Sequence, residues 1–448
     1  RSDRLAGTLA AALVIAGYAL AIGASSAPQA YDADSYIEEA QSFVNGAPAL
    51  YWAHNYAYAA FLALLQSVGI EQFVGIEDRL GVTLVQTTLL YAAVLAAAVS
   101  ISRSTHASVP VAAVPLAAVA LVPAAAWSGY TLSEALAAPV LLLVFGLTIL
   151  VTFRVLRLMS GTDRATLVLV LLLGLFAGLA WMTRPALLWI PAVSGLIVLG
   201  LGVYVTWRGD RWALLTPLVF AVGLVLVVLP QLGLGDPFKL ELARLQSGSA
   251  ELYFRYATSL TGCGPFDSLF FSPLAYSLLE PEAAGALAPD NPQWRLTAMV
   301  AHVVSGWDAR PSPTYMERWA DRRWLAVSAF SGFAIVAALT VVAIWLRRLR
   351  TFTRPRTAVL GALVLLFAVS QATLLMTVVE FRFNLTGWML AGCCFAVITG
   401  LRWWTPKRAG LFLLLGLFAS SLVLLIGQLT LMYSPYWLRC SGYLQGAP

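Results

Sequence analysis

Charged residues are scarce in this chain, and they make up only 11% of its 448 residues. Hydrophobic residues account for 60%, and the mean hydropathy is +0.80, outside the range of water-soluble proteins. The four cysteines show no CxxC spacing and the three histidines lie far apart, so we expect no zinc motif. The sequence has no Walker loop or other nucleotide-binding pattern. Its basic residues form short clusters between apolar runs, which argues against a nucleic-acid partner.

Long apolar runs fill most of the sequence. A helix needs about 20 apolar residues to cross a hydrocarbon core of ~30 Å. Eleven runs reach or approach that length, near residues 5–24, 80–101, 109–126, 134–153, 166–182, 186–206, 212–231, 324–346, 357–378, 385–401 and 409–432. We therefore predict an all-α polytopic membrane protein with about eleven transmembrane helices, interfacial helices in its first external loop and one large external loop.

The basic residues predict the orientation of these helices. If residues 56–68 lie on the membrane surface as an interfacial helix, more than half of the 28 basic residues fall in short connections on one side. Positively charged short loops stay cytoplasmic. The N-terminus is then predicted to be cytoplasmic and the C-terminus periplasmic. The composition, rich in alanine and arginine and poor in lysine, favours a bacterial inner membrane.

Three domains follow from this topology. Residues 1–231 form an N-terminal transmembrane module, whose first external loop covers residues 24–79. Residues 232–323 form a large periplasmic loop. Residues 324–448 form a C-terminal transmembrane module with a periplasmic tail. We interpret the basic start of the chain and the apolar run that follows as a retained first helix, because no clear small-residue cleavage site follows it.

An acidic segment follows the first apolar run. Asp32 and Asp34 lie two residues apart beside tyrosines, and Glu38 and Glu39 come next. Carboxylates at the mouth of a helix bundle can remove a proton from a hydroxyl or hold a divalent cation such as Mg²⁺, Mn²⁺ or Ca²⁺. The alternative is a helix that begins near Ser35 and is capped by Asp34, with acids favoured in its first turn. We assign Asp32 to function, because an acid at this depth is costly without a task.

This segment resembles the first external loop of the C-type glycosyltransferases, the polytopic superfamily that includes aminoarabinose transferases and dolichyl-phosphate-mannose protein mannosyltransferases. That loop carries the pattern D-x-x-x-Y-x-x-x-A before interfacial helices. Asp32, Tyr36 and Ala40 fit this pattern, and residues 56–68 fit an interfacial helix. The Pro-Leu-Tyr-Pro segment of the superfamily has no counterpart around His54 to Tyr58.

Three short turns extend the resemblance. Residues 128–134 are similar to an external turn that ends in Ser-Glu, residues 182–185 to a Thr-Arg-Pro turn, and residues 380–383 to a Glu-x-Arg-aromatic turn. All three fall on the external side of the topology derived from charge. The resemblance implies transfer of a sugar from a polyprenyl-phosphate donor to a lipid, glycan or protein acceptor on the periplasmic face, with inversion at the anomeric carbon.

The resemblance also implies roles for single residues. Asp32 is the expected base, and Asp34 and Tyr36 are expected to bind substrate. Arg184 and Arg382 are candidates to stabilise charge on the leaving phosphate.

Each of these two arginines has an alternative role. It can extend to the membrane interface or pair with an acid such as Glu380, which is itself a candidate for substrate binding. Glu134 begins an apolar run, where the helix dipole favours an acid. We expect Glu134 to orient Arg184 or to bind the sugar.

The large loop and the tail contribute further candidates. Arg255 lies among aromatic residues, a composition suited to stacking on a sugar and holding a phosphate. An amphipathic loop helix is the alternative. Cys263 and Cys440 are both predicted to be external and are candidates for a disulfide bond in an oxidising compartment. Cys393 and Cys394 are adjacent within an apolar run, where we expect them to pack.

Two other functions fit a polytopic chain. A transporter or flippase of lipid-linked sugars often has internal repeats and interrupted helices, and we find no repeat. An oligosaccharide ligase or polymerase is expected to use arginine and histidine in the large loop rather than an acid after the first span. The predicted partners are a polyprenyl-phosphate sugar donor, a lipid or glycan acceptor and membrane lipids.

Overall fold

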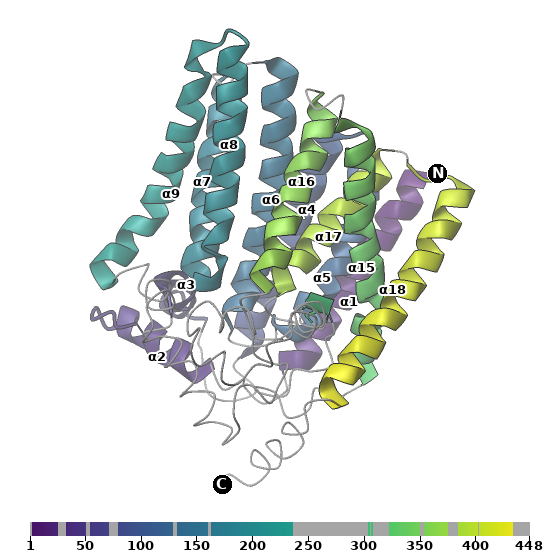
Figure 1. Ribbon diagram of the computed structural model, residues 1–448. Helices are drawn as coiled ribbons and strands as arrows, with labels where there is room; N and C mark the ends of the chain where they lie inside the picture. Colours follow the sequence, from purple (N-terminus) through teal and green to yellow (C-terminus); the bar gives the residue numbers. More distant parts are fainter. Residues whose placement is uncertain are drawn as a thin grey trace, which may run out of the picture. The chain divides into compact units, whose positions relative to one another are not determined.

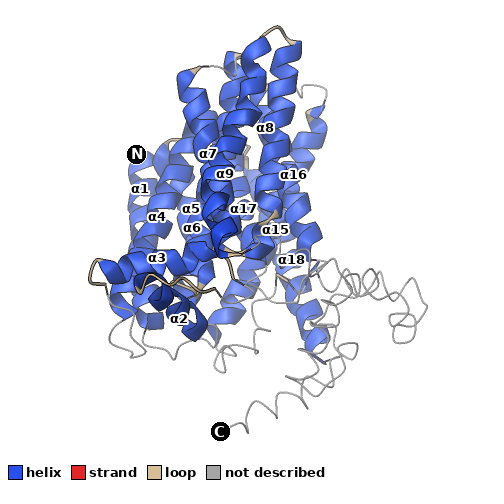
Figure 2. Ribbon diagram, turned by 90° about the vertical axis from the view of Figure 1, so that its left-hand side faces the viewer, coloured by secondary structure: helices blue, strands red, loops and turns tan. Residues whose placement is uncertain are grey.

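Helices dominate the part of the chain that the structure describes. This computed structural model describes residues 2–25, 33–50, 54–70, 79–128, 132–159, 163–235, 303–304, 306–307, 322–349, 354–374, 384–401 and 403–432 (Figure 1). Every regular element within these ranges is an α-helix or a 3-10 helix (Figure 2). The α-helices are α1 (Ser2–Ser25), α2 (Ala33–Val44), α3 (Tyr56–Ser67), α4 (Arg79–Ser104), α5 (Val109–Ala126), α6 (Ser133–Leu158), α7 (Arg164–Thr183), α8 (Trp189–Trp207), α9 (Leu215–Leu234), α15 (Arg322–Arg347), α16 (Pro355–Leu374), α17 (Leu385–Gly400) and α18 (Pro406–Met432). The 3-10 helices are η1 (Pro185–Leu187) and η2 (Arg211–Leu214).

Ten of the described helical segments are long and apolar enough to cross a membrane. This confirms the predicted all-α polytopic membrane protein. The remaining predicted span, residues 385–401, corresponds to α17, which has 16 residues and is about 24 Å long at 1.5 Å per residue. It is therefore shorter than the ten, although it is also apolar.

The chain divides into two compact units. The first contains Arg1–Pro237, Ala337–Phe367 and Trp388–Arg408, and the second contains Phe238–Val336, Ala368–Gly387 and Ala409–Pro448. The predicted domain boundaries stay a prediction, because residues 236–302 and 308–321 of the large loop lie outside the described residues.

Helices α1 and α4 to α9 of the first unit pack side by side. Contacts join α1 to α5, α4 to α6, α6 to α7, and α7 to both α8 and α9. Small residues allow the closest of these approaches: a Cβ atom on Gly174 of α7 would overlap the carbonyl oxygen of Phe220 on α9. Small residues that let two helix backbones approach closely are typical of helix pairs in membranes.

Helices α2 and α3 lie across one end of this bundle rather than along it (Figures 1 and 2). We call it the α2–α3 end. Helix α3 has 12 residues, or about 18 Å, too short to cross a membrane. It buries Tyr58 and Leu62 completely, while Leu64 is 60% exposed. Its length and its position across the end of the bundle agree with the prediction that this segment does not span the membrane.

The second unit is described more sparsely. Helices α15 and α18 meet within it through small residues, where the Ser420 hydroxyl donates to the Ala329 carbonyl. The Trp307 indole donates to Gln371 Oε1 over 2.8 Å, and the amide of Gln371 donates to Asn384 Oδ1 over 3.3 Å. These bonds satisfy buried polar groups next to helix ends.

Candidate functional site

A buried ion pair joins α6 to the end of α7. Proline restricts the residue before it to extended backbone, so α7 ends at Thr183, and Arg184, just before Pro185, is extended with φ −149° and ψ 116°. Glu134 lies in the first turn of α6, where the helix dipole favours an acid. Arg184 Nη1 lies 2.9 Å from Glu134 Oε1, and the two side chains are 12% and 3% exposed.

This pair suits recognition of an anion. A carboxylate fixes the guanidinium, whose planar fork of donors matches the geometry of a phosphate. The Ser133 hydroxyl also donates to Glu134 Oε2 over 3.3 Å. The structure thus pairs Arg184 with Glu134, the acid that the sequence analysis expected to orient it or to bind the sugar, at the α2–α3 end of the bundle.

Tyr58 of α3 lies next to the ion pair. Its hydroxyl donates to Gln86 Oε1 on α4 over 2.9 Å, and the Gln86 amide donates to the Ser128 carbonyl over 3.0 Å. Burial, Tyr36 and the charge of Glu134 raise the pKa of Tyr58 well above its usual value, although a hydrogen bond from the Leu132 backbone opposes this. Tyr58 is therefore a neutral phenol.

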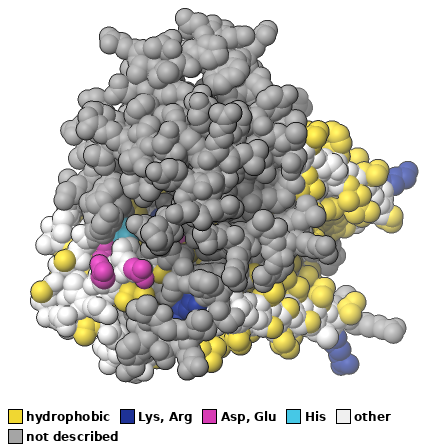
Figure 3. Space-filling model, turned by 90° about the horizontal axis from the view of Figure 1, so that it is seen from below, with side chains coloured by type: hydrophobic (Ala, Val, Ile, Leu, Met, Phe, Trp, Pro, Cys, Tyr) yellow, Lys and Arg dark blue, Asp and Glu magenta, His cyan; other side chains and the backbone are white. Residues whose placement is uncertain are grey.

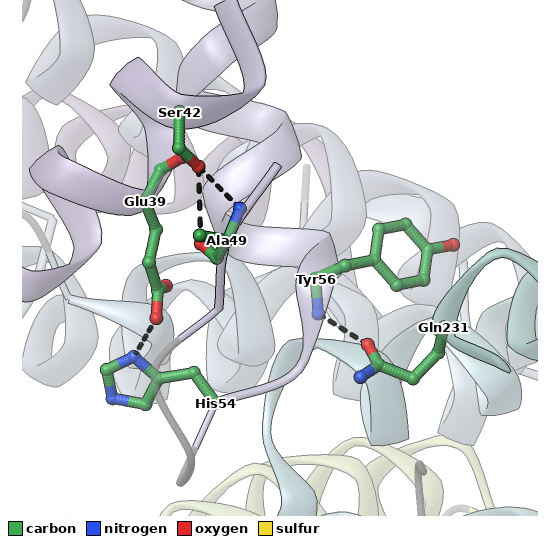
Figure 4. Close-up of polar contacts among 6 residues, drawn as sticks. All are labelled: Glu39, Ser42, Ala49, His54, Tyr56 and Gln231. Atoms are coloured by element: carbon green, nitrogen blue, oxygen red, sulfur yellow. Dashed lines mark hydrogen bonds and ion pairs between the residues drawn. The ribbon is translucent and has the colours of Figure 1, made fainter. Parts of the chain in front are cut away.

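A carboxylate and an imidazole meet where α2 and the segment before α3 come together. Glu39 Oε1 lies 2.9 Å from His54 Nδ1 (Figure 4). The Tyr36 ring stacks on the imidazole, with centroids 4.1 Å apart and an interplanar angle of 11°. The same ring meets Tyr58 edge-on at 5.0 Å. Through the Tyr36 ring, the Glu39–His54 pair is connected to Tyr58, which lies near Glu134.

Polar contacts fix α3 on the ends of α7 and α9. The Asn55 amide donates to the Trp181 carbonyl over 2.9 Å. The Tyr56 backbone N–H donates to Gln231 Oε1 over 2.9 Å (Figure 4), and its hydroxyl donates to the Val227 carbonyl over 2.8 Å. Three partners outside α3 therefore hold the start of this helix in place.

The predicted site residues separate into two groups. Asp34, Tyr36, Glu134 and Arg184 lie at the α2–α3 end. The others fall outside the described residues: Asp32, Arg255, Glu380, Arg382, Cys263 and Cys440. Their roles stay predictions.

The start of α2 needs a correction. The helix already includes Ala33, so Asp34 lies in its first turn instead of capping a helix that begins near Ser35. Asp34 is exposed there, where its charge still favours the helix through the dipole.

Sequence reasoning missed Glu39 and His54 as a pair, and it missed Tyr58 and Gln86. The sequence pattern places Glu39 only among the acids of a first helical turn, yet Glu39 is 5% exposed. A usable signal was present: Tyr36 and Glu39 are three residues apart and therefore share a helix face. The sequence contains no comparable signal for the position of His54 relative to that face.

Acidic side chains gather beside a histidine when this end is viewed from below (Figure 3). Asp34 and Glu38 are exposed on α2. Within the described residues, no group of three His, Cys, Asp or Glu side chains could hold a metal ion. The predicted cation between Asp32 and Asp34 stays a prediction, because Asp32 lies outside the described residues.

Comparisons with known proteins give likeness in structure alone, because no family model and no curated protein sequence matches the chain. The crystal structure of an oligosaccharyltransferase from Archaeoglobus fulgidus, in complex with zinc and sulfate, is 14% identical with a TM-score of 0.51. The match covers 94% of this chain and 53% of that one. A second crystal structure of that enzyme, tethered to an acceptor peptide by a disulfide bond, is 13% identical, with a TM-score of 0.49 and coverages of 97% and 55%.

This chain therefore spans about half the length of the oligosaccharyltransferase that it matches. The match to the zinc and sulfate complex, with a TM-score of 0.51, shows that the two proteins have similar folds. It confirms, at that level, the resemblance that the short motifs suggested. The chain is a polytopic helical membrane protein whose fold is similar to that of this oligosaccharyltransferase.

Proposed function

We propose that this protein is a membrane glycosyltransferase that moves a sugar from a polyprenyl-phosphate donor to a lipid, glycan or protein acceptor. The observation that carries the proposal is the buried Glu134–Arg184 pair, held at the bundle end that α2 and α3 cover. A fold like that of an oligosaccharyltransferase supports the same reaction class.

The reaction is a single displacement. The acceptor oxygen attacks the anomeric carbon while the bond from that carbon to the phosphate oxygen breaks, which inverts the anomeric centre. The polyprenyl phosphate leaves with the bonding electrons, and Arg382 or Arg184 stabilises the added negative charge. Asp32 takes the proton of the acceptor hydroxyl.

In our proposal the α2–α3 end faces the periplasm of a bacterial inner membrane. In the first unit, Arg103, Arg157 and Arg208 lie at or next to the ends of α4, α6 and α8 that are opposite the α2–α3 end. Short positively charged connections stay in the cytoplasm. The N-terminus is then cytoplasmic and the C-terminus periplasmic.

The test is product formation by the purified protein in detergent, with a panel of polyprenyl-monophosphate sugars and a membrane lipid extract. Wild type is compared with Asp32→Asn, and Glu38→Gln is the matched control because Glu38 is an exposed acid on α2. We expect transfer by wild type and the control and none by Asp32→Asn. Transfer by Asp32→Asn would remove this residue from the mechanism. No transfer with any donor would contradict the proposed function and favour a flippase.

A further inference from the structure

We propose that Asn384, directly before α17, binds a phosphate oxygen of the polyprenyl-phosphate donor through its side-chain amide nitrogen. A chain of hydrogen bonds in the second unit ends at this amide. Its nitrogen, Nδ2, is buried and has no hydrogen-bond partner among the described residues. The proposal rests on the proposed function, because that function supplies the phosphate.

Two neighbouring side chains determine which way the Asn384 amide faces. An indole nitrogen can only donate a hydrogen bond, so the atom of Gln371 that lies 2.8 Å from Trp307 Nε1 is the carbonyl oxygen, Oε1. The amino group of Gln371 therefore faces Asn384, and it donates to Asn384 Oδ1 over 3.3 Å. The oxygen and nitrogen of an amide lie on different branches of the group. Asn384 Nδ2 is thus a donor directed away from Gln371.

The first turn of α17 holds this pair of amides in place. Asn384 is 0% exposed and Trp307 is 2% exposed. A Cβ atom on Gly387 would overlap both Asn384 Oδ1 and Gln371 Nε2, so the glycine allows the two amides to lie over this turn. A buried donor without an acceptor destabilises a protein. A ligand that accepts its hydrogen bond removes this cost, and it meets a group whose orientation is already set.

The surroundings of Asn384 favour an acceptor with negative charge. The first N–H groups of a helix have no partner within the helix, and the helix dipole adds partial positive charge at that end. The described residues of the second unit include no aspartate or glutamate. Donation from Gln371 also polarises the Asn384 amide and strengthens it as a donor. In the sequence, Asn384 follows Arg382 by two residues, and Arg382 is one of the two arginines that our mechanism offers to the phosphate.

The first experiment compares the kinetics of Asn384→Leu and wild type, with the polyprenyl-monophosphate sugar that supports transfer. Leucine has about the size of asparagine but cannot donate a hydrogen bond. Because the amide holds the phosphate both before and during transfer, we expect the KM for the donor to rise about tenfold or more, with kcat and the acceptor KM nearly unchanged. Asn45→Leu is the matched control, since Asn45 is an exposed asparagine.

A second measurement does not depend on activity. The four asparagines of the chain are Asn45, Asn55, Asn291 and Asn384, so NMR of protein with ¹⁵N-labelled asparagine side chains can follow the Asn384 amide. Its signal is assigned by its loss in Asn384→Leu, or in Asn384→Ser if the leucine variant does not fold.

The probes are farnesyl phosphate, farnesol, inorganic phosphate and dihexanoyl phosphatidylglycerol, each added to wild type in n-dodecyl β-D-maltoside. We expect farnesyl phosphate to shift the Asn384 signal and farnesol to leave it unchanged, because farnesol has the same prenyl chain without the phosphate. The other two probes, at equal concentration, should shift the signal less, since each lacks part of a prenyl monophosphate.

The outcomes separate this proposal from the proposed function. An unchanged donor KM in Asn384→Leu, an unmoved signal with farnesyl phosphate, or an equal shift with farnesol would overturn the role of Asn384, while transfer by wild type would leave the proposed function intact. An equal shift with inorganic phosphate or phosphatidylglycerol would overturn the assignment to the donor. If wild type transfers no sugar but farnesyl phosphate shifts the signal, the proposed function fails and the phosphate site stands.

Discussion

Removal of the Glu134 charge should destabilise the protein strongly. The Arg184 side chain is 12% exposed, so Glu134→Gln leaves a largely buried guanidinium without its carboxylate. Breaking a buried pair in this way typically costs 3 to 5 kcal/mol. We expect a loss of about 3 kcal/mol, at the lower end of that range, because some solvent still reaches Arg184.

A double variant separates the charge from the packing. Replacing both partners, as Glu134→Gln with Arg184→Met, removes the uncompensated charge and keeps most of the side-chain volume. We expect the double variant to lose about 2 kcal/mol less than the sum of the two single variants.

Unfolding in mixed micelles, followed by the fluorescence of the 15 tryptophans, measures these free energies. The control cycle uses Asp163 and Arg154, an ion pair whose side chains are 38% and 35% exposed and whose coupling should be small. Additive losses for Glu134 and Arg184, within about 0.5 kcal/mol, would refute the reasoning.

The folded double variant should also fail to transfer sugar, and retained transfer would exclude Arg184 from binding the leaving phosphate.

Three further changes test other contacts. Tyr58→Phe leaves a buried amide oxygen without its donor and should cost about 1 to 3 kcal/mol of unfolding free energy; unchanged stability would contradict the bond. Gly174→Ala forces a Cβ against the Phe220 carbonyl and should cost about 1 to 3 kcal/mol, whereas Gly200→Ala, which meets nothing within 4 Å, should not destabilise. Asp163 has a pKa lowered from 3.8, chiefly by the hydrogen bond from Arg154, so it stabilises the fold above pH 3.8 and this contribution is lost as the pH falls through its folded pKa. The stability difference between wild type and Asp163→Ala should shrink in that range, and a pH-independent difference would contradict it.

Hydropathy and charge predicted the framework because both depend on local composition. Apolar runs in lipid can satisfy their backbone only as helices, and the ten described segments follow from that rule. The parity of the charged loops left residues 56–68 outside the spans, and α3 lies there as a short helix. Glu134 and Arg184 could be singled out because each stands at the end of an apolar run.

The Glu39–His54 contact could not be predicted in the same way. The two residues are 15 positions apart, and the chain between them contains the end of α2 and a turn at Gly46 with φ 72°. Their meeting depends on the anchoring of α3 to α7 and α9, by residues more than 120 positions later in the chain. Contacts of that kind follow from tertiary packing and not from any local pattern.

Tyr58 shows how the two parts of the site depend on each other. Its ring packs edge-on against Tyr36, and through Tyr36 it supports His54. Its hydroxyl lies between α4 and the turn that precedes Glu134. Because its raised pKa keeps it neutral across the physiological range, it connects the two parts by geometry and not by charge. A shift of α3 would therefore move His54 relative to Arg184, so the anchors at Asn55 and Tyr56 should set the distance between these two side chains.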